Sequence, residues 1–383
     1  MREVAIIGIG QVPVGEHWDS GLRMLAAEAI HAALQDAGLK TADALYIGSA
    51  FSGPFSSQLH LGALVADFAG LSGIESYSVE AADASGAAAL RTGFLAVASG
   101  TVETALVLGV EKSTDTVGSA RIQARSTSLD ADFEAAQGAT QPALAALLMR
   151  RYMHEYGLEL SAFEGFSINA HANGSRNPNA MFRNLIKPGS FARAPMISDP
   201  VNLFDGAPDA DGAAAVVLTA AERAADMVPQ PVRITASAAA TDNLALHDRP
   251  DLLTLRAARQ SADRAYAQAQ LGPEHISLFE LHDEYTVLAA LSLEAAGFAE
   301  RGQGWKLAQT GAVSLQGQIP VSTFGGLKAR GNPAGATGVY QAVEACLQLR
   351  GQAGDNQVAG ARTALLQNLG GLGATAITHI LQT

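Results

Sequence analysis

Four short stretches of this chain carry the side chains and backbone that could perform chemistry. They are Glu80-Ala-Ala-Asp-Ala-Ser-Gly, His282-Asp-Glu-Tyr-Thr, Gly325-Gly-Leu-Lys-Ala-Arg-Gly-Asn-Pro-Ala-Gly-Ala-Thr-Gly and Asn368-Leu-Gly-Gly-Leu-Gly-Ala-Thr. Carboxylates, imidazole and phenol are the usual carriers of general acid and base catalysis. Glycine-rich turns bring bare backbone close to a ligand. Together the stretches indicate an acid–base site, provided that the fold brings them together.

Asp83 lies where a short strand should turn into a helix, and small residues flank it on both sides. This position would leave the carboxylate uncovered, with the first N–H groups of the helix pointing towards it. Two interpretations remain open. Asp83 is either a functional group presented by the turn or an ordinary N-cap, because aspartate is a favoured capping residue.

The first part of the chain alternates strands with helices. Apolar runs of strand length alternate with segments whose apolar residues recur every three or four positions. The expected strands cover 4–9, 44–47, 77–79 and 104–109, and the expected helices cover 22–34 and 59–68 and follow Asp83. This order is typical of an α/β layered fold.

The alternation of strand and helix patterns stops between Lys112 and about Pro200. We expect one strong helix there, from Ala143 to Tyr156, and an ordered loop in the polar stretch that begins at His171. Long insertions of this kind are usually functional lids or disorder, and this one has too many apolar residues for disorder. The strand pattern resumes at Asp211-Gly-Ala-Ala-Ala-Val-Val-Leu.

The second part repeats the order strand, helix, strand, glycine-rich turn, helix, strand. The repeated segments are 232–236, 255–271, 276–281, the turn and helix from Gly331 to Leu349, and 363–367. Two similar halves packed about a pseudo-twofold axis would bring their glycine-rich helix starts together. We therefore expect Asp83 and Asn332 to lie close to each other.

Composition narrows the class of protein. The 383 residues are 48% hydrophobic and 16% charged, with a net charge of −12. That charge argues against nucleic acid as the main partner. No charged leader followed by an apolar segment is visible at the start, and no apolar run approaches the roughly 20 residues of a membrane span. The single cysteine, Cys346, excludes an internal disulfide framework and a multi-cysteine metal site. We expect a cytoplasmic protein with neither membrane nor metal.

The order, spacing and surroundings of the four stretches resemble the thiolase superfamily, in particular sterol-carrier-protein-type thiolases and archaeal acetyl-CoA acetyltransferases. The resemblance covers essentially the whole chain. It implies two halves in a five-layered α-β-α-β-α arrangement, namely 1–111 plus 201–222 and 223–383, with an inserted loop domain at 112–200. It also implies a homodimer or a dimer of dimers, and a coenzyme A thioester as substrate without a further cofactor.

The chain departs from the family at three site positions. The nucleophilic cysteine of the family belongs at Asp83, its activating histidine at Asn332 and its second cysteine at Glu284. His282, which in the family helps to form an oxyanion hole, is present, as are Gly370 and its glycine neighbours. Thiolase chemistry needs a thiolate, and a carboxylate is a poor nucleophile. Cys346 offers no substitute, because the pattern places it mid-helix in the core.

The remaining groups favour a different reaction on the same substrate class. His282 and the amide of Asn332 would stabilise a thioester oxygen as it becomes an enolate. Asp83 or Glu284 would act as base or acid at the adjacent carbon, and Tyr285 is a further proton donor. The set suits aldol or retro-aldol cleavage, or decarboxylation. The alternatives are a catalytically silent subunit, in which Asp83 caps a helix and Glu284 pairs with a basic residue, and residual acyl transfer.

Coenzyme A contacts are expected in two places. Basic residues gather in the insertion of this acidic chain and either clamp phosphates or are simply solvated: Arg176, Arg183, Lys187 and Arg193. The backbone at Gly326, Gly370 and Gly371 is expected to contact the substrate. Archaeal relatives act with a small zinc-ribbon and OB-fold partner, so the resemblance also raises the possibility of such a partner. Gly8-Ile-Gly10 lacks the third glycine of a dinucleotide site.

Overall fold

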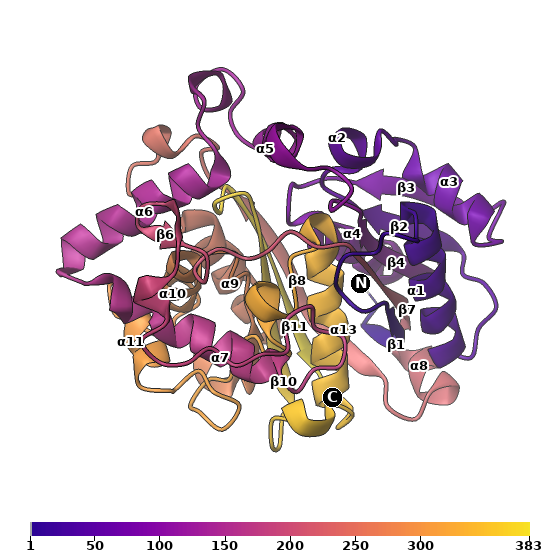
Figure 1. Ribbon diagram of the computed structural model, residues 1–383. Helices are drawn as coiled ribbons and strands as arrows, with labels where there is room; N and C mark the ends of the chain where they lie inside the picture. Colours follow the sequence, from indigo (N-terminus) through magenta and orange to yellow (C-terminus); the bar gives the residue numbers. More distant parts are fainter. Residues whose placement is uncertain (1) are drawn as a thin grey trace.

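A nine-stranded mixed sheet forms the frame of the computed structural model, which describes residues 2–383 (Figure 1). Its strand order is β3-β2-β4-β7-β1-β8-β11-β10-β9. In that order the strands are Glu75–Val79, Ala44–Gly48, Thr104–Glu111, Gly212–Ala220, Val4–Gln11, Val232–Thr241, Thr375–Gln382, Thr363–Gly370 and Leu278–Glu280. Two short strands of the insertion, β5 (Met196–Ser198) and β6 (Val201–Asn202), pair separately.

The two halves of the chain meet inside this sheet. β1 pairs with β7 along its length, but with β8 through only three residues, Val4, Ala5 and Ile6. Every residue of β4, β7 and β10 is buried. Strands that are covered on both faces need continuous apolar runs, which is the pattern that these segments carry.

Helices complete five layers. α1 (Leu22–Asp36) packs on β1 and β7, and α9 (Arg256–Ala269) packs on β8 and β11. The layer between the two halves of the sheet is α4 (Ser85–Ser99) with α13 (Thr337–Leu349), which contact each other and both halves. The predicted five-layered α/β arrangement is therefore confirmed.

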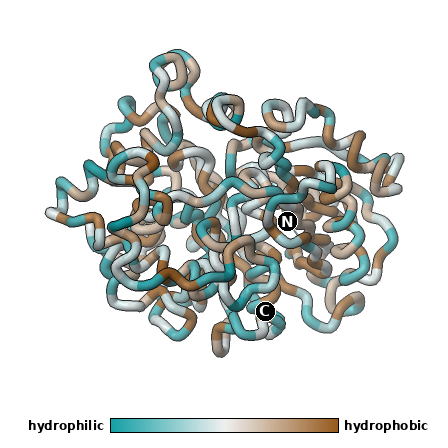
Figure 2. The backbone as a smooth tube through the Cα atoms, viewed as in Figure 1, coloured by the Kyte–Doolittle hydropathy of each residue, from teal (hydrophilic) through white to brown (hydrophobic). Residues whose placement is uncertain are grey.

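The remaining helices cover the outside and the junctions. Figure 1 shows α6 and α7 on the side away from α1 and α3. Outside the insertion these helices are α2 (Ser52–Ser56), α3 (Leu61–Phe68), α8 (Ala221–Met227), α10 (Thr286–Ala295), α11 (Gly304–Gln309) and α12 (Gly326–Ala329). In Figure 2 the hydrophilic residues, in teal, follow the outer turns of the molecule.

Glycines make the α4–α13 contact possible. A Cβ on Gly86 would lie 2.6 Å from the carbonyl oxygen of Gly335, and a Cβ on Gly338 would overlap the backbone nitrogen of Ala87. Both distances are shorter than any tolerated contact, so larger residues would force the two helix starts apart. The close approach brings the turn that holds Asp83, before α4, near the turn that holds Asn332, before α13, as the internal repeat predicts.

The insertion contains more helix than the sequence pattern indicates. It has α5 (Gly118–Ser126), α6 (Gln141–Tyr156) and α7 (Glu164–Gly174), whereas the pattern predicts one helix. The prediction of a loop from His171 is wrong up to Gly174, because these residues end α7. The helix has a polar buried face: the side-chain amides of Asn169 and Asn173 donate to the carbonyl oxygen of Val321. A polar buried face does not produce the apolar periodicity by which helices are recognised.

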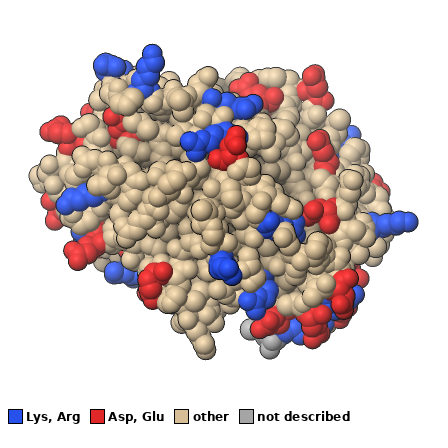
Figure 3. Space-filling model, turned by 90° about the horizontal axis from the view of Figure 1, so that it is seen from below, with Lys and Arg blue, Asp and Glu red and all other residues tan. Residues whose placement is uncertain are grey.

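The second half also differs in its boundaries. β8 continues to Thr241, and the predicted repeat does not include β11 as a separate strand. α13 begins at Thr337, because Gly331 to Ala336 form a turn that ends in a single 3-10 helical turn. None of the helices within residues 2–383 is both long and apolar enough to cross a bilayer. On the face seen in Figure 3 most of the surface is uncharged, and charged side chains are scattered over it with the densest mixed group at the lower right.

Candidate active site

Asp83 occupies the tight turn that joins β3 to α4. The turn is held by the Ser85 hydroxyl, which accepts a hydrogen bond from the Ala81 nitrogen at 3.0 Å and donates to the carbonyl oxygen of Ala82 at 2.6 Å. Ala82 takes a left-handed conformation, with φ of 50°. Asp83 itself is fully buried and its carboxylate receives no backbone N–H, because the N-cap position is Ala84. The capping interpretation is therefore wrong, as is the expectation that the side chain is uncovered.

Arg125 covers the Asp83 carboxylate. This arginine lies in α5 of the insertion, and its Nη1 donates to Asp83 Oδ1 at 2.7 Å. Its Nε donates to Asp209 Oδ1 at 2.9 Å, and its guanidinium stacks on the ring of Phe51. Burial alone would lower the pKa of Arg125, but the carboxylates of Asp209 and Asp83 raise it well above its ordinary value. Two negative charges are thus balanced by one permanent positive charge.

Glu284 is the second buried carboxylate of the cluster. Its Oε2 accepts a hydrogen bond from Gln141 Nε2 at 2.9 Å, and its Oε1 accepts one from Asn332 Nδ2 at 3.3 Å. Burial, followed by the charge of Asp83, raises the pKa of Glu284 above its usual range. Among the described residues no lysine or arginine pairs with it, and the basic residue within ion-pair distance is His282, whose Nε2 lies 3.9 Å from Oε2. Glu284 is suited to hold a proton.

His282 presents one ring nitrogen to the site. Its Nδ1 accepts a hydrogen bond from Asn368 Nδ2 at 2.8 Å, which places the ring proton on Nε2. That Nε2 lies 3.9 Å from Glu284 Oε2, beyond hydrogen-bond distance, and has no partner although it is buried. Asp83 Oδ2 is likewise buried without a partner. One donor and one acceptor are therefore unsatisfied in the same cluster.

Asn332 connects the cluster to the backbone around it. Its main-chain nitrogen donates to the carbonyl oxygen of Pro208 at 3.0 Å, and its side-chain oxygen accepts from the nitrogen of Ala334 at 3.0 Å. Tyr285 is buried, and burial followed by the charge of Glu284 raises the pKa of its hydroxyl well above the ordinary value. The phenol therefore stays protonated and can donate a hydrogen bond.

Two cavities approach the cluster from the insertion. The first has a volume of about 350 Å³, and the residues that line it include Glu284, Tyr285, Gln141, Arg121, Arg125 and Asp209. The second has a volume of about 580 Å³ and shares Ile197 and Ala207 with the first. Asp83, His282 and Asn332 line neither cavity. They lie directly behind Arg125 and Glu284.

The residues predicted to contact coenzyme A lie in different parts of the structure. Arg176 and Arg183 are exposed and line neither cavity, whereas Lys187 lines the larger one. Among the glycines, Gly326 packs against the carboxylate of Asp283, and Gly370 lies against the carbonyl oxygen of Ala81, two residues before Asp83. Gly371 has a left-handed φ of 54° and open space beside it, because the first atom that a Cβ there would meet is 3.9 Å away.

Sequence reasoning missed three residues of this site. Arg125 and Gln141 come from the irregular insertion, where no pattern links them to segments more than 40 residues away. Asn368 stands at the start of one of the four stretches, so its position beside the glycines was the signal that could have found it. Cys346 is buried in α13 as predicted, and burial raises the pKa of its thiol to about 12, which excludes a thiolate.

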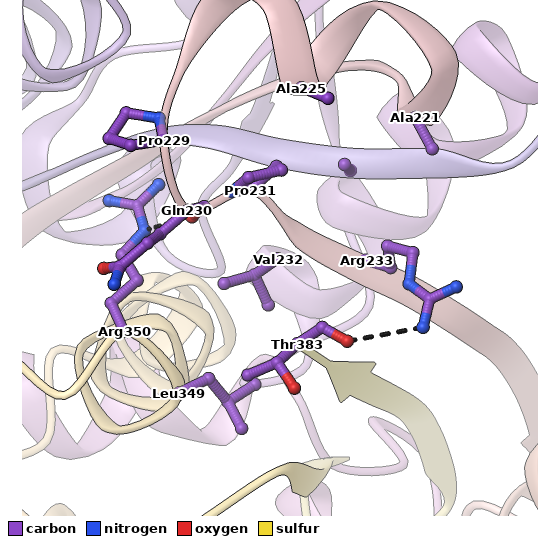
Figure 4. Close-up of a pocket in the computed structure, with 11 residues that line it drawn as sticks. Ala221, Ala225, Pro229, Gln230, Pro231, Val232, Arg233, Leu349, Arg350 and Thr383 are labelled. Atoms are coloured by element: carbon purple, nitrogen blue, oxygen red, sulfur yellow. Dashed lines mark hydrogen bonds between the residues drawn. The ribbon is translucent and has the colours of Figure 1, made fainter.

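A further cavity of about 460 Å³ lies at the other end of α13, near Leu349 (Figure 4). Its two cations are already engaged. Arg233 donates to the carbonyl oxygen of Thr383 at 3.3 Å, and Arg350 pairs with Asp36 at 2.8 Å. It has no chemical connection with the cluster around Asp83.

Comparison with known proteins places this geometry in a family. The profile described as "Thiolase, N-terminal domain" matches residues 4–194, and "Thiolase C-terminal domain-like" matches residues 238–383. An acetyl-CoA acetyltransferase of Methanothermobacter thermautotrophicus is 44% identical over 99% of both chains. The BbsB subunit of a benzoylsuccinyl-CoA thiolase from Thauera aromatica is 28% identical over 93% of this chain and 91% of its own.

A solved structure is also similar over the full length. It is described as an Ltp2-ChsH2(DUF35) aldolase, and it covers 100% of this chain and 98% of its own with a TM-score of 0.87 and 25% identity. The fold, both profile matches and the relative at 44% identity agree. The chain belongs to the thiolase family.

Proposed function

We propose that this protein makes or breaks a carbon–carbon bond next to the carbonyl of an acyl-CoA thioester, through an enolate and without an acyl-enzyme. The observation that carries the proposal is the unsatisfied pair in the buried cluster. Asp83 Oδ2 is an acceptor without a donor, and His282 Nε2 is a donor without an acceptor. Unpaired polar groups at such depth are costly, and they are typical of a site that a ligand completes.

In the retro-aldol direction, a β-hydroxyacyl thioester satisfies both groups. Asp83 Oδ2 accepts the proton of the β-hydroxyl, the bond between the α and β carbons breaks, and the electron pair moves to the thioester carbonyl. His282 Nε2–H then stabilises the enolate oxygen. Glu284, whose raised pKa favours the acid, returns a proton to the α carbon. Decarboxylation would use the same oxyanion contact.

The relatives support the substrate class. Proteins named for acetyl-CoA and benzoylsuccinyl-CoA are similar over nearly the whole chain, and a similar structure is described as an aldolase in complex with a DUF35 protein. The proposal therefore includes a small accessory protein that holds coenzyme A. It also includes a route for the substrate through the first cavity, past Arg125 and Gln141. Reactions that need a thiolate are disfavoured by aspartate at position 83.

The test is product formation from a β-hydroxyacyl-CoA by the wild type and by Asp83→Asn. The asparagine variant keeps the size of the side chain but cannot accept the proton, so the rate should fall by roughly 10²- to 10⁴-fold while thioester binding persists. Asp248→Asn, at an exposed position, is the control. Equal rates for wild type and Asp83→Asn would exclude the mechanism.

A second candidate is acyl transfer, which the name of the 44% identical relative favours. It requires a covalent acyl group on the protein. Intact-mass measurement after incubation with acetyl-CoA distinguishes the two, because the enolate mechanism leaves the mass unchanged. An acetyl adduct would assign the protein to acyl transfer instead.

A further inference from the structure

The larger cavity contains a nucleophilic group that the thioester mechanism does not use. Its walls are apolar, and the described residues that line it include no acid: they are Phe182, Leu185, Ile186, Ile197, Leu203, Phe204, Pro208 and several small or polar residues. Two lysines line it as well. Lys187 is exposed at the rim, whereas Lys328 is only 2% exposed.

The amine of Lys328 is held at the wall of this cavity. Lys328 belongs to the short helix α12, and its Nζ donates to the main-chain oxygen of Asp205. Asp205 begins the turn to Pro208 that separates the cavity from Glu284, since the nitrogen of Ala207 donates to the Glu284 carbonyl oxygen at 2.8 Å. The amine therefore uses one of its hydrogens on a neutral carbonyl and makes no hydrogen bond to a carboxylate.

The acids around Lys328 hold hydrogen bonds to other groups, except that Asp205 Oδ2 is buried without a partner. Asp283 accepts hydrogen bonds from the Leu327 nitrogen and the Ser322 hydroxyl, and Asp205 Oδ1 accepts both bonds of Thr286. Glu284 is bonded to Gln141 and Asn332, as described above. Their charges favour the ammonium, but burial outweighs them and lowers the pKa of Lys328. Burial also raises the pKa of Asp205, which reduces the opposing charge further.

His171 lines the same cavity as the amine. Its Nδ1 lies 2.9 Å from the carbonyl oxygen of Asn184, which places the ring proton on Nδ1 and leaves a lone pair on Nε2. Burial lowers the pKa of His171 and outweighs the opposing hydrogen bond to the Asn184 carbonyl oxygen, so the ring is a neutral base. An amine and an imidazole thus share one apolar cavity, and a desolvated lysine in a hydrophobic pocket is the usual form of a Schiff-base lysine.

We propose that Lys328 is a carbonyl-binding amine, which forms a reversible Schiff base with a small, largely apolar aldehyde or ketone in the 580 Å³ cavity. The Nζ lone pair forms a bond to the carbonyl carbon, and the carbonyl oxygen becomes a hydroxyl. His171 Nε2 carries a first proton from the added nitrogen to the oxygen, which forms that hydroxyl, and then a second one, so that the hydroxyl leaves as water while the nitrogen lone pair forms the carbon–nitrogen double bond. No electrons are gained or lost, so no further reactant is needed.

This site goes beyond the proposed thioester chemistry. It uses none of Asp83, His282 or Glu284, although the two cavities share Ile197 and Ala207. A carbonyl compound is also what a retro-aldol reaction releases, so the neighbouring cavity is placed to receive it.

Reductive trapping tests the proposal directly. The full-length protein is incubated at neutral pH with benzaldehyde and sodium cyanoborohydride, which converts a Schiff base into a stable secondary amine. The adduct increases the mass by that of the aldehyde less one oxygen atom, and peptide mapping locates it among the five lysines of the chain. Lys328 should be labelled roughly tenfold faster than exposed Lys306, because a solvated lysine amine is ordinarily protonated at this pH. Preferential labelling of the exposed lysines would overturn the proposal.

Labelling of variants distinguishes the contribution of the Lys328 amine from that of the cavity and from that of the thioester site. Lys328→Met should lose the fast adduct and Lys306→Met should keep it. Leu203→Trp places bulk in the cavity from an exposed position and should suppress labelling with Lys328 intact. His171→Ala should slow labelling several-fold. Asp83→Ala should label like the wild type, so a failure of the thioester mechanism would leave this result unaffected. If labelling instead required Asp83, the amine would belong to the thioester site.

Discussion

Asp83 and Arg125 behave as one unit with Asp209. The guanidinium balances the fully buried carboxylate of Asp83 and the partly exposed one of Asp209, and Asp83 has an oxygen without a hydrogen bond. The Asp83 carboxylate is therefore held in place through Oδ1, while Oδ2 is free to accept a hydrogen bond from a ligand. The ion pair therefore explains how a carboxylate is kept in place at a position where the resemblance to thiolases implies a thiol.

Removing the arginine from this ion-pair cluster should lower the stability of the protein. Arg125→Met leaves the buried carboxylate of Asp83 without a counter-charge, and the free energy of unfolding should fall by about 3–5 kcal/mol. Urea denaturation measures the loss. Arg151→Met, which removes an exposed pair with Glu155, should cost less than about 1 kcal/mol. If Asp83→Asn in the Arg125→Met background does not restore part of the stability, the unpaired carboxylate is not the cause.

The rate should fall as the pH rises through the raised pKa of Glu284. Only the protonated form can return a proton to the α carbon, and burial together with the charge of Asp83 favours that form. The plot of kcat/KM against pH for a β-hydroxyacyl-CoA should therefore have a descending limb, which Glu284→Gln should remove together with most of the rate. Glu159→Gln, at an exposed position, should leave the profile unchanged. A descending limb that persists in Glu284→Gln belongs to another group.

The sequence identified single residues of the site but not the residues that form hydrogen bonds with them. Asp83, His282, Glu284 and Asn332 converge as expected, since short stretches with unusual composition mark them. Arg125 lies in a helix that the pattern does not predict and Gln141 at the start of one that it does, and their hydrogen bonds span 42 and 143 residues. Such pairings are decided by the packing of the whole chain. The sequence could not reveal that the carboxylate of Asp83 would be covered.

The helix pair α4 and α13 sets the distance between the two halves of the site. Each helix starts immediately after a residue of the cluster or its turn, so any separation of their starts moves Asp83 away from Asn332. The internal repeat predicted this arrangement, because it assigned the same role to both glycine-rich turns. It did not predict α7, whose polar buried face satisfies backbone carbonyls rather than filling a core.

Gly338→Ala should weaken both fold and site. The new methyl group would overlap the Ala87 nitrogen, so α13 must move, and the cost should be about 1–3 kcal/mol. Activity measured well below the melting temperature should fall further than this stability loss explains. Gly21→Ala is the control, because nothing lies within 4 Å of its new methyl group. Full activity in a folded Gly338→Ala variant would show that the spacing of the two helices is not critical.

For the molecule as a whole, the two edges of the sheet differ. The outer edge of β9 is covered, because the Phe279 nitrogen donates to the carbonyl oxygen of Pro320 and the Ser322 nitrogen donates back to that of Phe279. β3, at the other edge, is largely exposed, including Tyr77 at 46%. Open edges attract another strand. The predicted homodimer is therefore expected to form through β3.

Light scattering after size exclusion tests this expectation. The wild type should have the mass of a dimer, and Ser78→Lys, which adds charge to the edge strand, should shift the protein towards the monomer. Ser99→Lys, at the exposed end of α4, should remain dimeric. A monomeric wild type, or a dimer that tolerates Ser78→Lys at low concentration, would place the interface elsewhere.

The pairing of β1 has a consequence for how the chain is made. Its partners are β7, which begins at Gly212, and β8, which begins at Val232. β1 therefore cannot form a hydrogen bond to a neighbouring strand until the ribosome has synthesised β7, which begins past the middle of these 383 residues. During translation an apolar segment without a neighbour is exposed for many seconds at about 5–20 residues per second. The innermost strand of the finished protein is the one in greatest need of protection on the ribosome.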